Sequence, residues 1–287
     1  PSGRFFDSFT LLIFAVGVVT GSYLFRAVRI VDEASPFGGQ VQDVWVQDGY
    51  IRQVADQLTP DANTRLIEAQ GLCVSSGWID LRAANNDPGH EYKESAQSLQ
   101  EAALRGGFVQ LVLMPNTQPV VDSKDTLNYV RQLGADGIVT FLPTAAVTHK
   151  AQGIDFTEML DLHRAGAIAF SDGIQPIQNP DILLKALLYL RPIDGLLINR
   201  IEDEQLTRFG QMHEGPTSTV LGLKGMPPLA EELMLLRDLK LLRYALEESA
   251  LPMPSRPILH VAGVSTAAAV EAIRKAKAEG LPVSCDL

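Results

Sequence analysis

Cysteine is rare in this sequence. Its 287 residues include only Cys73 and Cys285, which form neither a disulfide framework nor a CxxC metal motif. Cys73 lies within an apolar run, so we expect it to be a small buried residue. Because the chain makes so little use of cysteine, a reducing compartment is expected, and we predict a cytoplasmic location.

Positive charge is scarce as well. Lys and Arg number 24 against 34 Asp and Glu, so the net charge is −10, and no basic stripe stands out along the chain. This acidic balance argues against a nucleic-acid partner. The sequence also lacks a Gly-x-Ser-x-Gly elbow, a P-loop and a dinucleotide-binding fingerprint, so it carries none of these three catalytic or nucleotide-binding signatures.

The longest stretch without charge is at residues 8–25. Its 18 residues are close to the minimum for a membrane-spanning helix, but its valines also suit a strand. Three interpretations stay open: an extension foreign to the domain, a membrane anchor, or a structured part of the fold. We therefore set residues 1–22 apart as an apolar extension whose status is open, and a membrane-tethered form depends on residues 8–25 alone.

Residues 23–76 have the pattern of a small β domain. Residues 23–31 and 41–47 are strand-like, Asp48-Gly49 is a signal for a two-residue hairpin, and residues 50–54 pair back.

After Gly77, strand and helix patterns alternate, which predicts parallel βα units. After a first strand over residues 72–79, the expected strands are residues 108–114, 138–147, 167–171, 196–199, 257–262 and 282–286. The expected helices are residues 94–105, 124–133, 155–164, 180–190, 229–248 and 266–279, with a long irregular loop before residue 229. A closed barrel needs eight units. We therefore predict, over residues 77–287, an α/β fold of TIM-type (β/α) barrel, C-terminally incomplete, with about six to seven units.

Five stretches place polar residues at the ends of the expected strands. They are GWIDLRAAN from residue 77, MPNTQP from residue 114, AFSDG from residue 169, RIED from residue 200 and HVAGVST from residue 260. In order and content they resemble the motifs of dihydroorotases, which are members of the amidohydrolase superfamily. The resemblance covers roughly residues 23–287. It implies a barrel of the amidohydrolase kind after a small β domain.

The positions that bind zinc in that family mostly hold other residues here. The family's first strand is followed by His-x-His and a substrate-binding Arg, and these three places read Arg82, Ala84 and Asn86. Two later ligand histidines are replaced by Arg200 and Gly263, which leaves Asp172 as the remaining family ligand. The Arg-x-Ala after the first strand resembles divergent dihydroorotase-like proteins of the Bacteroidetes type.

Metal chemistry leads to the same expectation without the family. Hydrolysis of a cyclic amide at neutral pH usually needs a metal-bound hydroxide, and a zinc site needs three or four His, Cys, Asp or Glu ligands. Among the five residues at these positions only Asp172 can bind a metal, and an arginine can pair with it instead. We therefore expect no cofactor and no intact catalytic residue, the family's general base lying beyond Leu287.

Two asparagines are the candidate substrate-binding residues. Asn116 lies in a Pro-bracketed loop and can recognise an amide or a carboxylate, or simply stabilise the turn. Asn86 can supply one hydrogen bond where the family uses Arg. Among the histidines, we expect His260 to be a core residue with a hydrogen-bond partner, and we expect a loop or helix-capping role for the pair Glu202 and Asp203.

The resemblance implies a role in de novo pyrimidine biosynthesis, namely the interconversion of carbamoyl aspartate and dihydroorotate. One hypothesis is an enzyme of that pathway acting on this small-molecule substrate, impaired or with a rearranged site. The alternative is a catalytically dead structural partner of aspartate carbamoyltransferase, and a homo-oligomer is a further predicted assembly.

Overall fold

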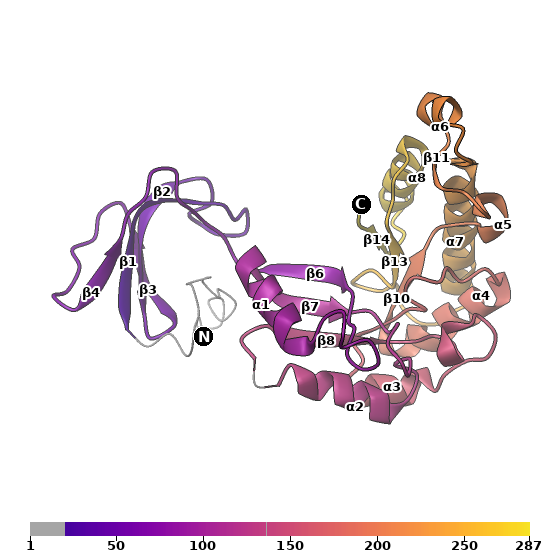
Figure 1. Ribbon diagram of the computed structural model, residues 1–287, viewed down its shortest axis with the longest axis horizontal. Coiled ribbons are helices and arrows are strands. Elements are labelled where there is room, and N and C mark those ends of the chain that lie inside the picture. The colour runs from indigo at the N-terminus through magenta and orange to yellow at the C-terminus, as the bar shows by residue number, and fades with distance from the viewer. Residues whose placement is uncertain (1–20, 136) are drawn as a thin grey trace. The chain divides into compact units, whose positions relative to one another are not determined.

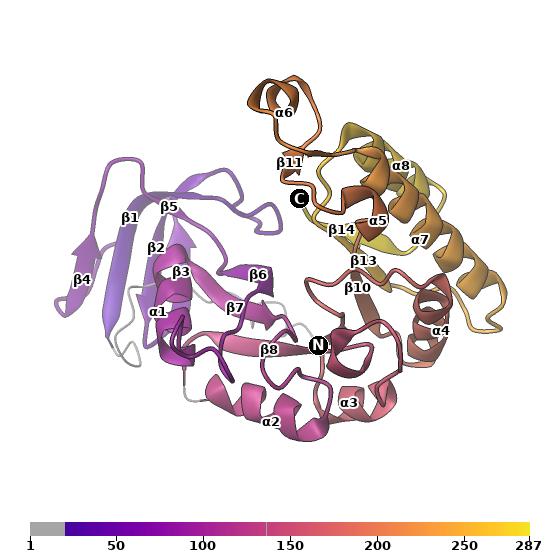
Figure 2. The same cartoon turned by 45° about the vertical axis from the view of Figure 1, so that its right-hand side comes forward.

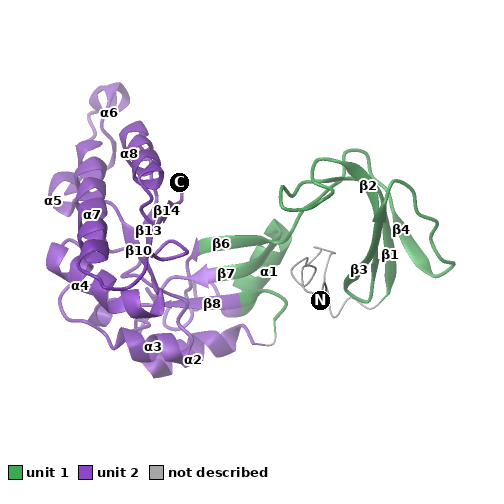
Figure 3. Ribbon diagram, turned by 180° about the vertical axis from the view of Figure 1, so that it is seen from behind, with its two compact units in different colours: residues 1–81, 97–111, 136–140 green, residues 82–96, 112–135, 141–287 purple. Residues whose placement is uncertain are grey.

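The computed structural model describes residues 21–135 and 137–287 (Figure 1). The chain divides into two compact units, residues 1–81, 97–111 and 136–140, and residues 82–96, 112–135 and 141–287 (Figure 3). Most of the apolar stretch at residues 8–25 lies outside the described residues, and its last part belongs to the first strand. Within the described ranges, none of the helices is long and apolar enough to cross a membrane.

The small β region is a sheet in the order β3-β2-β1-β4, with β5 paired to β1. Its strands are β1 (Ser22–Ile30), β2 (Val41–Gln47), β3 (Tyr50–Ala55), β4 (Thr64–Ile67) and β5 (Cys73–Val74). The hairpin predicted at Asp48-Gly49 is confirmed: Gln47 pairs with Tyr50, and Asp48 and Gly49 have positive φ angles of 51° and 82°.

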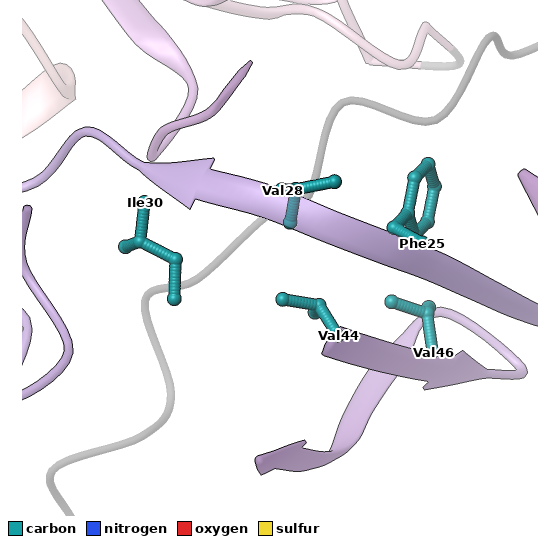
Figure 4. Close-up of a cluster of buried hydrophobic side chains, with 5 residues drawn as sticks. All are labelled: Phe25, Val28, Ile30, Val44 and Val46. Atoms are coloured by element: carbon teal, nitrogen blue, oxygen red, sulfur yellow. The ribbon is translucent and has the colours of Figure 1, made fainter. Parts of the chain in front are cut away.

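Alternating apolar side chains of β1 and β2 form the core of this small sheet. Phe25, Val28 and Ile30 meet Val44 and Val46 (Figure 4). Burial of side chains of this size stabilises a fold by roughly 1.5–3 kcal/mol each.

Cys73 does not join this core, so the prediction of a buried Cys73 is wrong. The thiol is exposed, whereas Val74 packs against the buried cluster. Successive side chains of a strand point to opposite faces, so inward placement of Val74 turns Cys73 outward.

The second sheet has seven strands in the order β14-β13-β10-β9-β8-β7-β6. They are β6 (Trp78–Ala83), β7 (Phe108–Leu113), β8 (Thr140–Ala145), β9 (Ala169–Phe170), β10 (Leu196–Arg200), β13 (Leu259–Ala262) and β14 (Val283–Cys285). The pairings from β8 through β14 are parallel. The parallel sheet predicted after the small β region is therefore confirmed, and among the described residues β6 and β14 are its first and last strands.

A layer of helices follows the order of the strands. The helices between the strands are α1 (Ala96–Gly106), α2 (Lys124–Leu133), α3 (Met159–Ala165), α4 (Pro180–Leu190), α7 (Leu229–Glu247) and α8 (Ala267–Ala278). Contacts join α2 to α3, α3 to α4, α4 to α7 and α7 to α8 (Figure 2). Neighbouring βα units therefore lie side by side, as in the outer layer of a (β/α) barrel.

Two expected elements differ from the structure. The first barrel strand begins later than expected, at Trp78, and continues through Arg82 to Ala83, where the carbonyl accepts from Met114 N at 3.0 Å. The stretch expected to be irregular before α7 instead holds short elements, because local caps and pairings satisfy its backbone. These are α5 (Glu204–Thr207), β11 (Met212–His213), α6 (Pro216–Leu221) and β12 (Gly225–Met226).

Candidate functional site

The carboxyl ends of parallel strands meet at one edge of a sheet, and the predicted site residues lie there. They fall into two groups, both in the larger compact unit. One group surrounds Asp286, directly after β14, and the other surrounds Asp172, shortly after β9.

The first group, which we call the Asp286 cluster, consists of Arg82, His260, Gly263 and Asp286. Arg82 Nε donates to Asp286 Oδ2 at 2.6 Å, and Gly263 N donates to Asp286 Oδ1 at 2.6 Å. His260 Nε2 lies 3.4 Å from Oδ2 of the same carboxylate. Burial raises the pKa of Asp286, but the hydrogen bonds from Gly263 and Arg82 and the charge of Arg82 outweigh it, so the pKa is lowered overall.

His260 is confirmed as a core histidine with a partner. It is only 4% exposed, and its Nδ1 lies 2.9 Å from Ser284 Oγ, the side chain of its register partner on β14. The strand pairing itself therefore orients the imidazole toward Asp286.

The second group, the Asp172 pocket, is built around a buried carboxyl. Thr148 N and Thr148 Oγ1 donate to Asp172 at 2.9 and 2.6 Å, and Gly153 N donates to Thr148 Oγ1 at 2.8 Å. Burial raises the pKa of Asp172, and the hydrogen bonds from Thr148 only partly oppose it. The arginine partner anticipated for Asp172 is thus replaced by a threonine.

Asn116 uses both ends of its amide to hold the loop after β9. Its Nδ2 donates to the Asp172 carbonyl at 3.1 Å, and its Oδ1 accepts from Ile174 N at 3.0 Å. The side chain therefore stabilises this loop, and it also lines an open pocket of about 610 Å³ together with Asp172, Gln152, Gln175 and Gln178.

A buried network supports the other side of the same loop. Arg237 on α7 donates to the carbonyls of Gln178 and Ile177 at 2.6 and 2.7 Å and to Asp238 Oδ1 at 2.8 Å. Asn199 on β10 donates to Asp238 Oδ2 at 2.7 Å and accepts from Ile177 N at 3.1 Å. Burial raises the pKa of Asp238 to about 6 although the charge of Arg237 and both hydrogen bonds oppose it.

The other predicted residues belong to neither group, although Arg200 and Glu202 line one pocket together with Gly263. Arg200 pairs with Glu202 at 2.5 Å, and Asp203 caps α5 by accepting from Gln205 N and Leu206 N, which confirms its capping role. The Asn86 carbonyl accepts from His90 N at 2.8 Å. Ala84 is exposed.

This donor set does not fit the zinc ion of the related enzymes. Arg82 and Gly263 stand at two of the four positions where altered ligands were predicted, and the guanidinium of Arg82 is held by a carboxylate. Throughout the described parts of the chain, no three His, Cys, Asp or Glu side chains are grouped so that they could hold a metal ion.

Sequence reasoning missed the residues that complete both groups. Thr148 follows the strand expected at 138–147, and Asp286 lies at the end of the strand expected at 282–286, so position alone was a usable signal for both. Asn199 ends the strand expected at 196–199 and carried the same signal, whereas Arg237 and Asp238 had none, because they lie within the helix expected at 229–248.

Comparison with known proteins identifies the lineage. The family model described as Dihydro-orotase-like matches residues 71–246. The dihydroorotase of Pelobacter propionicus is 37% identical over 259 residues, covering 90% of this chain and 58% of that protein. The dihydroorotase of Syntrophus aciditrophicus is 37% identical over 265 residues, covering 92% of this chain and 60% of that protein. The chain thus spans less than two thirds of the length of these curated relatives.

Solved structures show the same fold at lower identity. The L-hydantoinase (dihydropyrimidinase) of Arthrobacter aurescens matches with a TM-score of 0.69 at 20% identity, over 93% of this chain and 58% of that one. A D-hydantoinase (dihydropyrimidinase) from Thermus sp. matches with a TM-score of 0.64 at 17% identity, over 92% of this chain and 57% of that one. These likenesses confirm the predicted barrel type. By its sequence matches, the chain belongs to the dihydroorotase family of the amidohydrolase superfamily.

Proposed function

We propose that this chain serves de novo pyrimidine biosynthesis as a dihydroorotase-family protein whose hydrolysis of the cyclic amide is impaired or lost. The observation that carries the proposal is the ion pair between Arg82 and Asp286, since Arg82 stands where relatives place a metal ligand. A guanidinium held by a carboxylate neither binds a divalent cation nor activates water.

The charges around the site support the proposal. Arg82 and Arg200 both lie at altered ligand positions, and each would repel a divalent cation. Asp172 is the one remaining family ligand, and its carboxyl already accepts two hydrogen bonds from Thr148. A single carboxylate does not make a zinc site.

The Asp172 pocket is the part of the site that can still bind a small molecule. Its volume of about 610 Å³ is within the range of ligand pockets. Gln152 and Gln175 line it with amide groups that can donate to and accept from a ureido or amide group. A carbamoyl aspartate-like ligand carries such a group. Asn86 stays a predicted substrate contact, and Asn116 acts by shaping the loop.

The test is a metal analysis joined to an assay of the reaction in both directions. On the full-length protein we expect zinc far below one equivalent and a rate at least about a thousandfold below that of a zinc-bearing relative, because the activated water is lost. The dihydroorotase of Pelobacter propionicus, purified and assayed in parallel, is the control. Stoichiometric zinc together with turnover would sink the proposal.

A second candidate role is that of a structural partner of aspartate carbamoyltransferase. The observation that favours it is a set of exposed apolar side chains in and beside α6, with Phe209 74%, Val220 85% and Leu221 59% exposed. Exposed apolar groups gathered on one segment are typical of protein interaction surfaces. Co-elution of the two purified proteins on size exclusion, lost in Val220→Asp, is the expected result. Separate elution at micromolar concentration contradicts this role, and a complex unchanged by the substitution contradicts the assignment of α6 as its contact surface.

A further inference from the structure

We infer that the Asp286 cluster ties together the two end strands of the seven-stranded sheet, and that it replaces the metal centre in cross-linking this end of the barrel. The inference concerns how the sheet is held, so it does not depend on whether the protein turns over a substrate.

The sheet order places the partners at opposite ends of the sheet. Arg82 lies in β6, and Asp286 follows β14 directly, with five strands between these two. The residues are 204 positions apart in the chain, yet Arg82 Nε and Asp286 Oδ2 are 2.6 Å apart. A contact between the carboxyl ends of the two end strands holds the sheet in its curved form.

The Asp286 carboxylate binds groups from separate parts of the chain, as a metal ion binds its ligands. Here the central group is negative and its partners are hydrogen-bond donors. Oδ2 receives Arg82 Nε from β6, and Oδ1 receives Gly263 N from the loop after β13. His260 Nε2, from β13 itself, lies 3.4 Å from Oδ2. The carboxylate after β14 therefore links two other segments of the chain, β6 and the end of β13, as a bound metal links separate segments when it couples ligand binding to folding.

Partial burial makes this ion pair stronger than one at the surface. The side chains of Arg82 and Asp286 are 31% and 22% exposed, and that of His260 is 5% exposed. Reduced contact with water weakens the screening of the charges. The pair Arg243–Glu279 joins α7 to α8 at 2.5 Å, but its side chains are 46% and 42% exposed, so it serves as a matched control.

The glycine at position 263 fits this arrangement. Gly263 has a φ of +71°, a conformation that side chains other than glycine rarely adopt, and it directs its N–H at Asp286. A Cβ placed there would lie 3.7 Å from both terminal nitrogens of Arg82. That distance is an ordinary van der Waals contact, so position 263 lies directly beside the guanidinium.

The experiment is a double-mutant cycle on the full chain, with Arg82→Met, Asp286→Asn and the double variant. Denaturant unfolding measures the ratio of folded to unfolded protein. We expect each single substitution to lower that ratio by about 10- to 100-fold, because it leaves a partly buried charge without its partner. The double variant should be no less stable than the less stable of the two single variants, which gives a coupling of at least about tenfold.

The control cycle uses Arg243→Met and Glu279→Gln, for which we expect a coupling below about fivefold. A coupling at Arg82–Asp286 no larger than the control value overturns the inference. Should Arg82→Met fail to fold, Arg82→Gln takes its place in the cycle, since glutamine is polar but carries no charge. Stability of Arg82→Gln equal to that of the native chain would then overturn the inference.

Zinc and a chelator supply an independent readout. We expect the Tm of the native chain to be the same with excess zinc and with EDTA, because the cluster already occupies the cross-linking position. A rise in Tm with zinc that EDTA reverses would show that a metal still performs this task, and it would overturn the inference whatever the activity assay shows.

Discussion

Asp172 and Asp286 follow two strands of one sheet, but their surroundings set their ionisation in opposite directions. Asp286 faces a guanidinium and a backbone N–H, and its pKa is lowered. Asp172 is more deeply buried and is held by Thr148, and its pKa is raised. Position at the carboxyl ends of the barrel strands therefore does not by itself set the pKa of a carboxyl group. Its partners and its contact with water do.

The two groups also differ in the role they have at the carboxyl ends of the strands. The Asp286 cluster is charged and joins distant strands, so its role is to hold the sheet. The Asp172 pocket is lined by amides and one carboxyl, so it retains the polar groups that a small ligand needs.

We expect the greatest loss of stability from a substitution that removes the support of the Asp172 pocket and leaves the Asp286 cluster untouched. Arg237→Met takes the partner from Asp238, which is 0% exposed, and frees two carbonyls of the pocket loop. We expect a loss of about 3–5 kcal/mol of unfolding free energy, because a buried charge is left unpaired. Urea unfolding measures it, with exposed Arg243→Met as the control. Equal losses in the two variants would contradict the support role.

A pH series tests whether burial sets the pKa of Asp238, which supports the loop of the Asp172 pocket. The folded pKa of Asp238 is about 6, above the ordinary value of 3.8, so protonation favours the folded state. Its stabilising contribution is fully present below pH 3.8 and is lost as pH rises through about 6. Between pH 4 and 7 we expect the native chain to lose on the order of 2 kcal/mol relative to Asp238→Asn. Parallel profiles of the two proteins would refute the assignment.

Two glycines with positive φ allow the two groups to be compared directly, since Gly173 lies beside the Asp172 pocket and Gly263 belongs to the Asp286 cluster. A Cβ on Gly173 (φ +72°) would meet Asn116 Oδ1 at 1.7 Å, whereas one on Gly263 would meet Arg82 only at 3.7 Å. Gly173→Ala therefore combines strain with a clash, and we expect a loss of about 2–4 kcal/mol against about 1 kcal/mol for Gly263→Ala. Thermal unfolding of both variants decides the order, and the reverse order would show that the pocket loop yields easily.

The smallest expected effects come from the Asp172 carboxyl itself. Thr148→Val removes the hydroxyl that donates to Asp172 and accepts from Gly153, and we expect a loss of about 1–2 kcal/mol. Asp172→Asn keeps an acceptor for Thr148 N and relieves a buried charge, so a change below about 1 kcal/mol is expected. Denaturant unfolding at pH 7 measures both. A loss in Asp172→Asn as large as in Asp286→Asn would erase the distinction between the two sides.

Much of the fold followed from patterns local in the sequence. The alternation of strands and helices after Gly77 predicted the parallel sheet, and Asp48-Gly49 predicted its hairpin, because both signals depend on near neighbours. The short helices α5 and α6 escaped prediction because caps such as Asp203 define them and their apolar periodicity is too short to detect. Cys73 was misjudged because the face of a strand is set by its register.

The sequence alone indicated the family and predicted that the family's ligand positions hold other residues. Arg82, Ala84, Arg200 and Gly263 are visible in the order of the motifs, since motif order needs no coordinates. Only the tertiary structure decided what those residues do now. Arg82 pairs with Asp286 because the curvature of the sheet brings the ends of β6 and β14 together. Asp172 does not pair with Arg82, and its carboxyl accepts its hydrogen bond from the Thr148 hydroxyl instead. Partners such as Arg82 and Asp286, 204 residues apart, are chosen by how the strands are arranged in space.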